Sequence, residues 1–163
     1  MVDSKNVLTA AVVTVSDSCA RGERKDGSGP AVVEFLEKLH FSVTVREVVP
    51  DDEIQIQNLL IRLAREVPLI VTTGGTGIAP RDVTPEATTK ICDRVLDGVA
   101  ETMRREGMKK TPFAALSRGV CGVRGKALIL NLPGSPAGAV ESLVAVAGLL
   151  PHAIELLGGR TEH

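Results

Sequence analysis

The sequence of 163 residues contains no tryptophan, no tyrosine and only three phenylalanines, Phe35, Phe41 and Phe113. The chain therefore has almost nothing on which a nucleic-acid base or a flavin ring could stack. Its formal net charge is −1, and no block of like charges interrupts it. Because nucleic-acid and anionic membrane surfaces attract strongly basic patches, we expect neither nucleic acid nor membrane as the main partner.

Cysteine is also scarce. Cys19, Cys92 and Cys121 are odd in number and far apart, with no C-x-x-C pair, which excludes a disulfide framework and a zinc site. The apolar run near the N-terminus is too short to span a bilayer and has no small-residue cleavage site after it. We expect a cytoplasmic protein, and residues 1–163 have the length of one domain.

Strand and helix patterns alternate along the first half of the chain. Apolar, β-branched runs predict strands at 7–15, 42–49 and 69–73, and helical spacing predicts a helix from Pro30 and another over 52–66. Strands that alternate with helices imply right-handed crossovers and a parallel sheet. The predicted fold class is therefore α/β, with three layers, a mostly parallel central sheet and helices on both faces.

The second half adds a small β-hairpin excursion, formed by residues 117–123 and 126–131. Two helices are predicted before it, over 86–95 and 99–106. A long apolar helix over 136–157 is predicted after it, with a kink at Pro151. The polar, glycine-rich segment 19–29 is most simply a mobile loop.

The stretch LIVTTGGTGIAPRDVTP, residues 69–85, reads as a buried strand that ends in a glycine loop. Gly74, Gly75 and Gly77 allow positive φ and bring backbone N–H groups close to an anion. The loop matches neither the Walker motif nor G-x-G-x-x-G, which needs glycine where Pro80 stands. The alternative is that the glycines only permit a tight turn. Thr84 is the predicted N-cap of the next helix.

Open parallel sheets bind ligands beyond the carboxyl ends of their strands. Those ends carry Ser16 and Asp17, Asp51, the glycine loop with Asp82, and residues 131–135. Glycine loops for phosphate beside free carboxylates are typical of a Mg²⁺-nucleotide site. Three alternatives stay open: Asp51 and Asp82 as helix caps, Asp17 as a turn residue, and Ser117-Arg118 as a phosphate clamp or only the start of the hairpin.

Six motifs carry a resemblance to a known family. They are T-V-S-D at 14–17, V-P-D-D at 49–52, T-T-G-G-T-G at 72–77, R-D-V-T-P-E-A at 81–87, L-S-R at 116–118 and N-L-P-G-S-P at 131–136. In this order, over nearly the whole chain, they resemble the MogA/MoaB-type molybdopterin adenylyltransferases, which also occur as the G domain of gephyrin.

The resemblance implies an α/β domain that forms a homotrimer, or a hexamer in some members. It implies an enzyme that uses ATP and Mg²⁺ to adenylylate the terminal phosphate of molybdopterin, releasing pyrophosphate, and that hands its product to a downstream molybdenum-insertion protein. The family's two functional aspartates fall on Asp51 and Asp82, as catalytic residues and metal ligands. Ser135 departs from several members, which carry lysine there.

Together, the residues and the resemblance give a set of predicted substrate-binding positions: Ser16, Asp17, Gly74, Gly75, Thr76, Gly77, Arg81, Ser117, Arg118, Asn131, Pro133, Gly134 and Ser135. One alternative function is a catalytically inactive paralogue that binds a pterin or nucleotide as an oligomer. A flavodoxin-like or receiver-like domain fits less well, because the strand at 69–73 ends in Thr-Gly-Gly rather than a phosphoacceptor aspartate.

Overall fold

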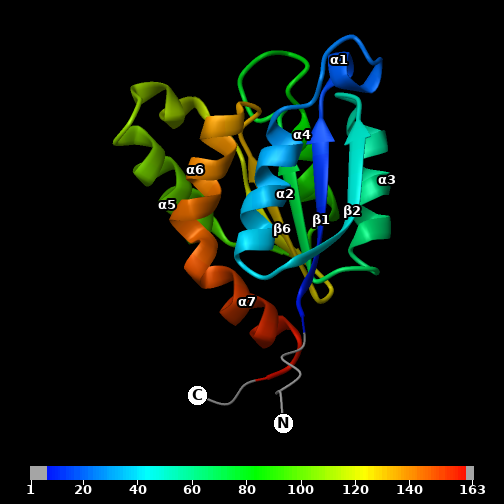
Figure 1. Ribbon diagram of the computed structural model, residues 1–163, viewed down its shortest axis with the longest axis vertical. Coiled ribbons are helices and arrows are strands. Elements are labelled where there is room, and N and C mark those ends of the chain that lie inside the picture. Colours follow the sequence, from blue (N-terminus) through cyan, green and yellow to red (C-terminus); the bar gives the residue numbers. More distant parts are fainter. Residues whose placement is uncertain (1–6, 161–163) are drawn as a thin grey trace.

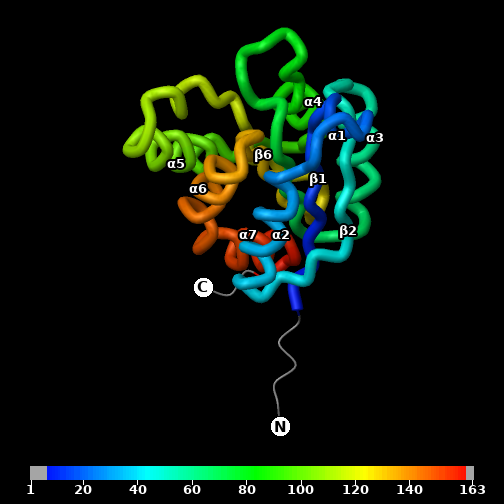
Figure 2. The backbone as a smooth tube through the Cα atoms, turned by 45° about the horizontal axis from the view of Figure 1, so that its top comes forward, coloured from blue at the N-terminus to red at the C-terminus, as the bar shows by residue number. Residues whose placement is uncertain are grey.

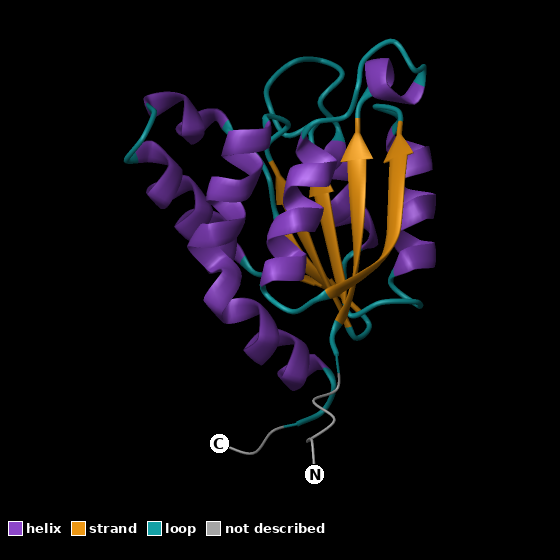
Figure 3. Ribbon diagram, in the orientation of Figure 1, coloured by secondary structure: helices purple, strands orange, loops and turns teal. Residues whose placement is uncertain are grey.

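Within residues 7–160, which the computed structural model describes, six strands form one sheet in the order β2-β1-β3-β6-β5-β4 (Figures 1 and 3). The parallel strands are β1 (Thr9–Val15), β2 (Ser42–Val49), β3 (Leu69–Thr73) and β6 (Ala127–Leu132). At one edge, β5 (Cys121–Arg124) pairs antiparallel with β6, and β4 (Arg94–Val95) pairs antiparallel with β5. The sequence therefore predicted β2 and β3 residue for residue, and it also predicted the β5–β6 hairpin.

Helices cover both faces of this sheet. The helices on one face are α2 (Ser28–Lys38), α5 (Asp97–Met108), α6 (Pro136–Val146) and α7 (Leu150–Leu157), and those on the other are α3 (Glu53–Leu63) and α4 (Thr84–Ile91). Short helical turns are α1 (Asp17–Ala20), η1 (Pro112–Leu116) and η2 (Ala147–Leu149). The predicted three-layer α/β fold is confirmed.

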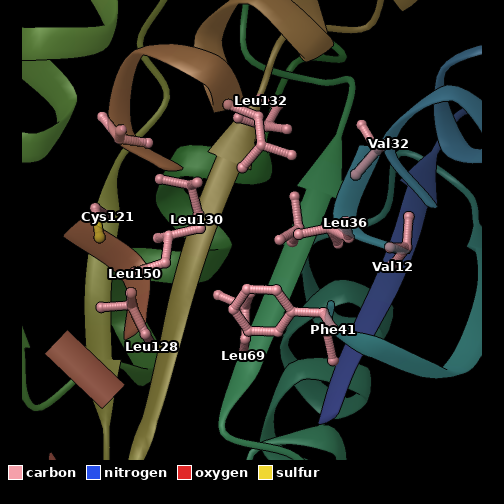
Figure 4. Close-up of a cluster of buried hydrophobic side chains, with 14 of the residues drawn as sticks. Val12, Val32, Leu36, Phe41, Leu69, Cys121, Leu128, Leu130, Leu132 and Leu150 are labelled. Carbon is pink, nitrogen blue, oxygen red and sulfur yellow. The ribbon is translucent and has the colours of Figure 1, made fainter. Parts of the chain in front are cut away.

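The alternation of side chains along the strands builds two separate cores. In β1, Ala10 and Val12 face the α2–α6 side, whereas Ala11 and Val13 face α3 and α4. Figure 4 shows the first core, where leucines of β3 and β6 meet Leu36 of α2. Because both faces are buried, the central strands read as continuous apolar runs.

Two predicted helices differ from those observed by more than a shift of their bounds. The helix predicted over 86–95 begins at Thr84 and ends at Ile91, because Arg94 and Val95 pair with β5 instead. The helix predicted over 136–157 is interrupted by η2, before the predicted kink. Pro151 lies in the first turn of α7, where its missing N–H costs nothing.

The run Pro136–Leu157 is long and apolar enough to cross a membrane by length and composition, with a mean hydropathy of 1.6. Its inward residues, including Leu143, Val146 and Leu150, lie in the core against the sheet. On its outer side, Val144, Leu149 and Leu156 are exposed. The run is thus packed on one side only.

Candidate active site

A cavity of about 790 Å³ opens at the carboxyl ends of β1, β2, β3 and β6. From β1 the chain moves to β2 on one side and then to β3 on the other, and such a reversal is where open parallel sheets bind ligands. Figure 2 shows the loops after these strands gathered at one end of the sheet. The predicted site residues that line the cavity are Ser16, Asp17, Asp51, Gly74, Gly75, Thr76, Gly77, Arg81, Asp82, Ser117, Pro133, Gly134 and Ser135.

Asp17 and Asp51 join the ends of β1 and β2 through two reciprocal hydrogen bonds. The Asp17 N–H donates to Asp51 Oδ2 at 2.9 Å, and the Asp51 N–H donates to Asp17 Oδ1 at 2.8 Å. The next residue, Asp52, caps α3 by accepting the Gln55 N–H at 2.9 Å. The reading of Asp51 as the helix cap is therefore wrong, and its carboxylate is held at the cavity wall.

Burial raises the pKa of the Asp51 carboxyl, and the negative charge of Asp17 adds to the rise. The hydrogen bond from the Asp17 N–H and the positive charge of Arg81 act in the opposite direction without cancelling it. A carboxylate in this position gains from a cation placed beside it. The corner between β1 and β2 is therefore electrostatically suited to positive charge.

The glycine loop needs its glycines at two positions. Gly74 and Gly75 have φ of 92° and 67°. A Cβ on Gly74 would lie 2.3 Å from the Val15 carbonyl oxygen, and a Cβ on Gly75 would lie 2.2 Å from Thr84 Oγ1 and 3.3 Å from Asp51 Oδ1. The loop thus runs directly against the end of β1 and the Asp51 carboxylate, at a distance that only glycine permits.

Asp82 flanks the same loop near Gly77. Its Oδ2 accepts the Ala79 N–H at 3.0 Å and would lie 2.8 Å from a Cβ on Gly77. Asp82 does not cap α4, which has Val83 at the N-cap position and no side-chain cap. The predicted cap, Thr84, is wrong as well: this residue is buried and donates its hydroxyl to the Gly74 carbonyl at 3.0 Å. Thr84 thereby holds the start of the glycine loop from the protein interior.

The loop after β6 closes the cavity beside Gly74. The Gly74 N–H donates to the Leu132 carbonyl at 3.0 Å, and a Cβ on Gly134 would lie 3.3 Å from Gly74 Cα. Ser135 caps α6 by accepting the Gly138 N–H at 3.2 Å. The N-terminus of α6, with its partial positive charge, therefore faces the cavity.

Two predicted site residues, Arg118 and Asn131, are not brought to the cavity wall with the others. Arg118 donates from Nε to the Gly77 carbonyl and from Nη2 to the Asp82 carbonyl, each at 2.8 Å, and pairs with Glu86. Asn131 is buried and donates to Thr72 Oγ1 and Thr88 Oγ1, each at 3.0 Å. Both hold the framework behind the loops.

Sequence reasoning missed most of one wall of the cavity and one carboxylate. Asp26 lines the cavity, accepts the Thr14 hydroxyl at 2.6 Å and accepts the Gly29 N–H at 3.0 Å, so that it fixes the segment predicted to be mobile. An aspartate just before the start of α2 was a usable signal. Of the wall formed by residues 111–117, which include η1, only Ser117 was predicted, and no local pattern places the others there.

The lining of the whole cavity carries both positive and negative charge. Three arginines, Arg21, Arg24 and Arg81, line the cavity together with the carboxylates described above. Residues 7–160 contain no cluster of three or more His, Cys, Asp or Glu side chains able to hold a metal alone. Mg²⁺ is commonly bound by one or two carboxylates together with phosphate oxygens and waters. The donor chemistry of Asp51 and Asp82 beside the glycine loop fits that arrangement.

Comparison with known proteins adds independent findings. Residues 11–152 match the family model described as a probable molybdopterin binding domain. A molybdopterin adenylyltransferase of Helicobacter pylori is 42% identical over 152 residues, which cover 91% of this chain and 86% of that protein. The cinnamon protein of Drosophila melanogaster, named for molybdenum cofactor synthesis, is 42% identical over 93% of this chain, which spans only 26% of its length.

A solved structure points the same way. The crystal structure of the molybdopterin biosynthesis enzyme MoaB from Thermus thermophilus superposes with a TM-score of 0.89. It is 52% identical in sequence, and the match covers 94% of this chain and 98% of that one.

Proposed function

The chain belongs to the family of molybdopterin-binding domains of molybdenum cofactor biosynthesis, and we propose that it is a molybdopterin adenylyltransferase. It transfers AMP from ATP to the terminal phosphate of molybdopterin and releases pyrophosphate. The observation that carries the proposal is the position of Asp51 and Asp82 on either side of the glycine loop in one cavity. An inactive, ligand-binding paralogue would have no need of this acid pair.

We propose that Asp51 and Asp82 hold Mg²⁺ against the phosphates of ATP. When bound, the ion neutralises charge on the phosphate oxygens and fixes their geometry. The backbone N–H groups of the glycine loop and the Arg81 guanidinium bind the remaining equatorial oxygens. The raised pKa of Asp51 supports this role, because a buried carboxylate gains from a nearby cation.

The reaction needs alignment more than proton transfer. The terminal phosphate of molybdopterin is already an anion at neutral pH and attacks the α-phosphorus of ATP directly. A phosphorus–oxygen bond forms between the two phosphates, and the bond between the α-phosphorus and the bridging oxygen of pyrophosphate breaks. The described residues that line the cavity include no histidine, and this chemistry requires none. The chain's contribution is to position the phosphates in line.

We propose a homotrimer as the working assembly, with a hexamer as the alternative. Exposed apolar side chains along α6, η2 and α7 support an interface, since Val144, Leu149 and Leu156 are 55%, 50% and 41% exposed. The adenylylated product is passed to a downstream molybdenum-insertion protein, and the enzyme works in the cytoplasm.

The test is incubation of the chain with molybdopterin, ATP and Mg²⁺, followed by mass detection of adenylylated molybdopterin. We expect Asp51→Asn and Asp82→Asn each to lower the rate at least about a hundredfold, because neutral amides cannot hold the metal against the phosphates. Both amides keep the backbone hydrogen bonds of the aspartates they replace.

The matched control is Asp52→Asn, which changes the adjacent carboxylate but keeps a good helix cap. We expect this variant to retain the wild-type rate. Full activity in Asp51→Asn or Asp82→Asn would exclude the assigned roles. Absence of product from the wild-type chain, with ATP still bound, would favour the inactive paralogue.

A further inference from the structure

Phe113 is the most exposed of the large apolar side chains in the described part of the chain, at 76%, and it lines the cavity. Phe41 is buried in the core and Phe35 packs against it. The expectation that the chain has almost no ring available for stacking therefore needs a correction at this one position. An aromatic side chain left in water at the edge of a ligand-sized cavity calls for an explanation.

The segment that carries Phe113 is held at its start and packs on α5. The Phe113 N–H donates to Thr111 Oγ1 at 3.3 Å, and Lys110 pairs with Glu141 of α6 at 3.0 Å. A Cβ on Gly107 would lie 2.9 Å from Ala114 Cβ, so η1 packs closely on α5. Figure 1 shows this lime-coloured segment beside the upper end of α6. Phe113 is thus exposed on a supported turn.

The wall formed by the strand ends has little apolar surface for a bound ring. The strand ends present hydroxyls, carboxylates, arginines and backbone N–H groups, which suit phosphates. Around Phe113 the lining changes character, with Ala114 and the half-exposed Leu116 beside it. Ligand sites of 300–1,000 Å³ usually combine a few polar groups with apolar and aromatic walls. The cavity of about 790 Å³ therefore has one end for phosphates and one for a ring.

We propose that Phe113 is the stacking surface for a fused nitrogen heterocycle of the bound substrate, a purine or a pterin. Both rings are flat and have a π-face that an aromatic side chain can cover. The inference rests on the proposed function, because it assumes substrates in which phosphate and heterocycle are joined. It assigns Phe113 to substrate specificity, and the bond-forming step does not involve it.

The first experiment measures affinity by calorimetry, in the presence of Mg²⁺, for ATP, molybdopterin and inorganic triphosphate. For Phe113→Ala we expect about 5- to 100-fold weaker binding of the substrate whose ring stacks, with inorganic triphosphate unchanged. Phe113→Leu, which keeps apolar bulk without a ring, should lose most of the same affinity. Phe113→Tyr should retain it. Because the side chain is exposed, these variants should fold normally.

The three ligands in this experiment distinguish the two rings that could stack on Phe113. Weakened ATP binding alone identifies adenine as the ring, and weakened molybdopterin binding alone identifies the pterin. Unchanged affinity for both would overturn the proposal, and so would an equal loss for inorganic triphosphate. If Phe113→Ala instead dissociates the assembly in sedimentation while both affinities stay unchanged, a second copy of the chain covers the ring and the stacking role is wrong.

A second measurement uses the absence of tryptophan and tyrosine from the sequence. Phe113→Trp creates a single tryptophan, whose emission should be quenched by the stacking substrate and not by inorganic triphosphate. The control is Val7→Trp, at a side chain 65% exposed that precedes β1 and lies outside the cavity. Equal quenching in both variants would count against stacking. If all Phe113 variants adenylylate molybdopterin at the wild-type rate and bind both substrates as tightly as the wild type, the stacking role is excluded and the proposed function stands.

Discussion

The two walls of the cavity are built in different ways. The strand-end wall, residues 74–82 with the ends of β1 and β2, is fixed by close backbone contacts and by hydrogen bonds to buried groups such as Thr84. The η1 wall, residues 111–117, is held mainly by its own turns and by its packing on α5. The first wall is polar and the second carries exposed apolar side chains.

This difference suggests that the two walls bind different parts of the substrate. Charged phosphates require donors and metal ligands placed within a few tenths of an ångström, and the wall that we propose to bind them is the one anchored to the sheet. A heterocycle needs a flat apolar surface, and its stacking tolerates looser support. Arg118, one residue beyond the η1 wall, connects the two, because its guanidinium holds the Gly77 and Asp82 carbonyls.

The largest effect on stability and activity should come from Gly75→Ala, which changes a residue of the strand-end wall. Gly75 has a left-handed φ of 67°, and alanine in that conformation lowers the free energy of unfolding by about 1–2 kcal/mol. Its Cβ would meet Thr84 Oγ1 at 2.2 Å, which adds about 1–3 kcal/mol of overpacking. We expect a free energy of unfolding lower by the sum of these costs, measured by urea denaturation, together with loss of adenylylation because the loop moves away from Asp51.

Gly98→Ala is the matched control for that change. Gly98 lies in α5 with a negative φ and no atom within 4 Å of the added Cβ. Alanine there should leave activity unchanged and keep or slightly raise stability. If Gly75→Ala behaved like Gly98→Ala, the strand-end wall would not be the tightly constrained one of the two.

A smaller effect is expected from Arg118→Lys, which weakens the connection between the walls. Lysine keeps the charge, but its single ammonium group cannot reproduce the fork that holds two carbonyls. We expect kcat/KM for adenylylation to fall roughly tenfold, equivalent to about 1.4 kcal/mol. The free energy of unfolding should fall by roughly 0.5–1.5 kcal/mol, because at least one of the two carbonyls loses its donor.

Arg94→Lys supplies the comparison, since Arg94 is an exposed residue of β4 outside the cavity. A wild-type rate in Arg118→Lys, or an equal loss in Arg94→Lys, would show that the two walls are positioned independently. The binding of inorganic triphosphate, followed by calorimetry, should weaken in Arg118→Lys alone.

Sequence signals were sufficient for the strand-end wall because its determinants are local. An apolar strand followed by Gly74 and Gly75 predicts both the end of β3 and a loop with positive φ. The rule that ligands bind at strand ends then gathered Asp17, Asp51 and Asp82 into one site. Where these cues were ambiguous, as between Asp51 and Asp52 for the α3 cap, only the fold decided.

Apart from Ser117, the η1 wall could not be found in this way. Phe113 reaches the cavity because α5 returns the chain to the sheet end and Gly107 lets η1 pack closely on it. Similarly, Arg118 belongs to a motif of the family, but its contacts with Gly77 and Asp82 depend on tertiary structure. Long-range placement of this kind leaves no periodicity or capping signal in the sequence.

The smallest effect should come from Glu86→Gln, which removes only the ion pair of Arg118 and leaves both of its carbonyl bonds. The hydrogen bond from Arg118 lowers the pKa of Glu86, so the pair stabilises the fold above the ordinary glutamate pKa and loses that contribution as pH falls through the lowered value. Both side chains are about 40% exposed, which limits the contribution to roughly 0.2–1 kcal/mol. The wild type and Glu86→Gln should therefore differ in urea denaturation at pH 7 and converge as pH falls through the lowered pKa of Glu86. Glu34→Gln, which breaks an exposed pair with Lys38 on α2, should show the same pH trend without any change in kcat/KM. A loss of activity in Glu86→Gln as large as that in Arg118→Lys would mean that the ion pair, and not the carbonyl bonds, joins the two walls.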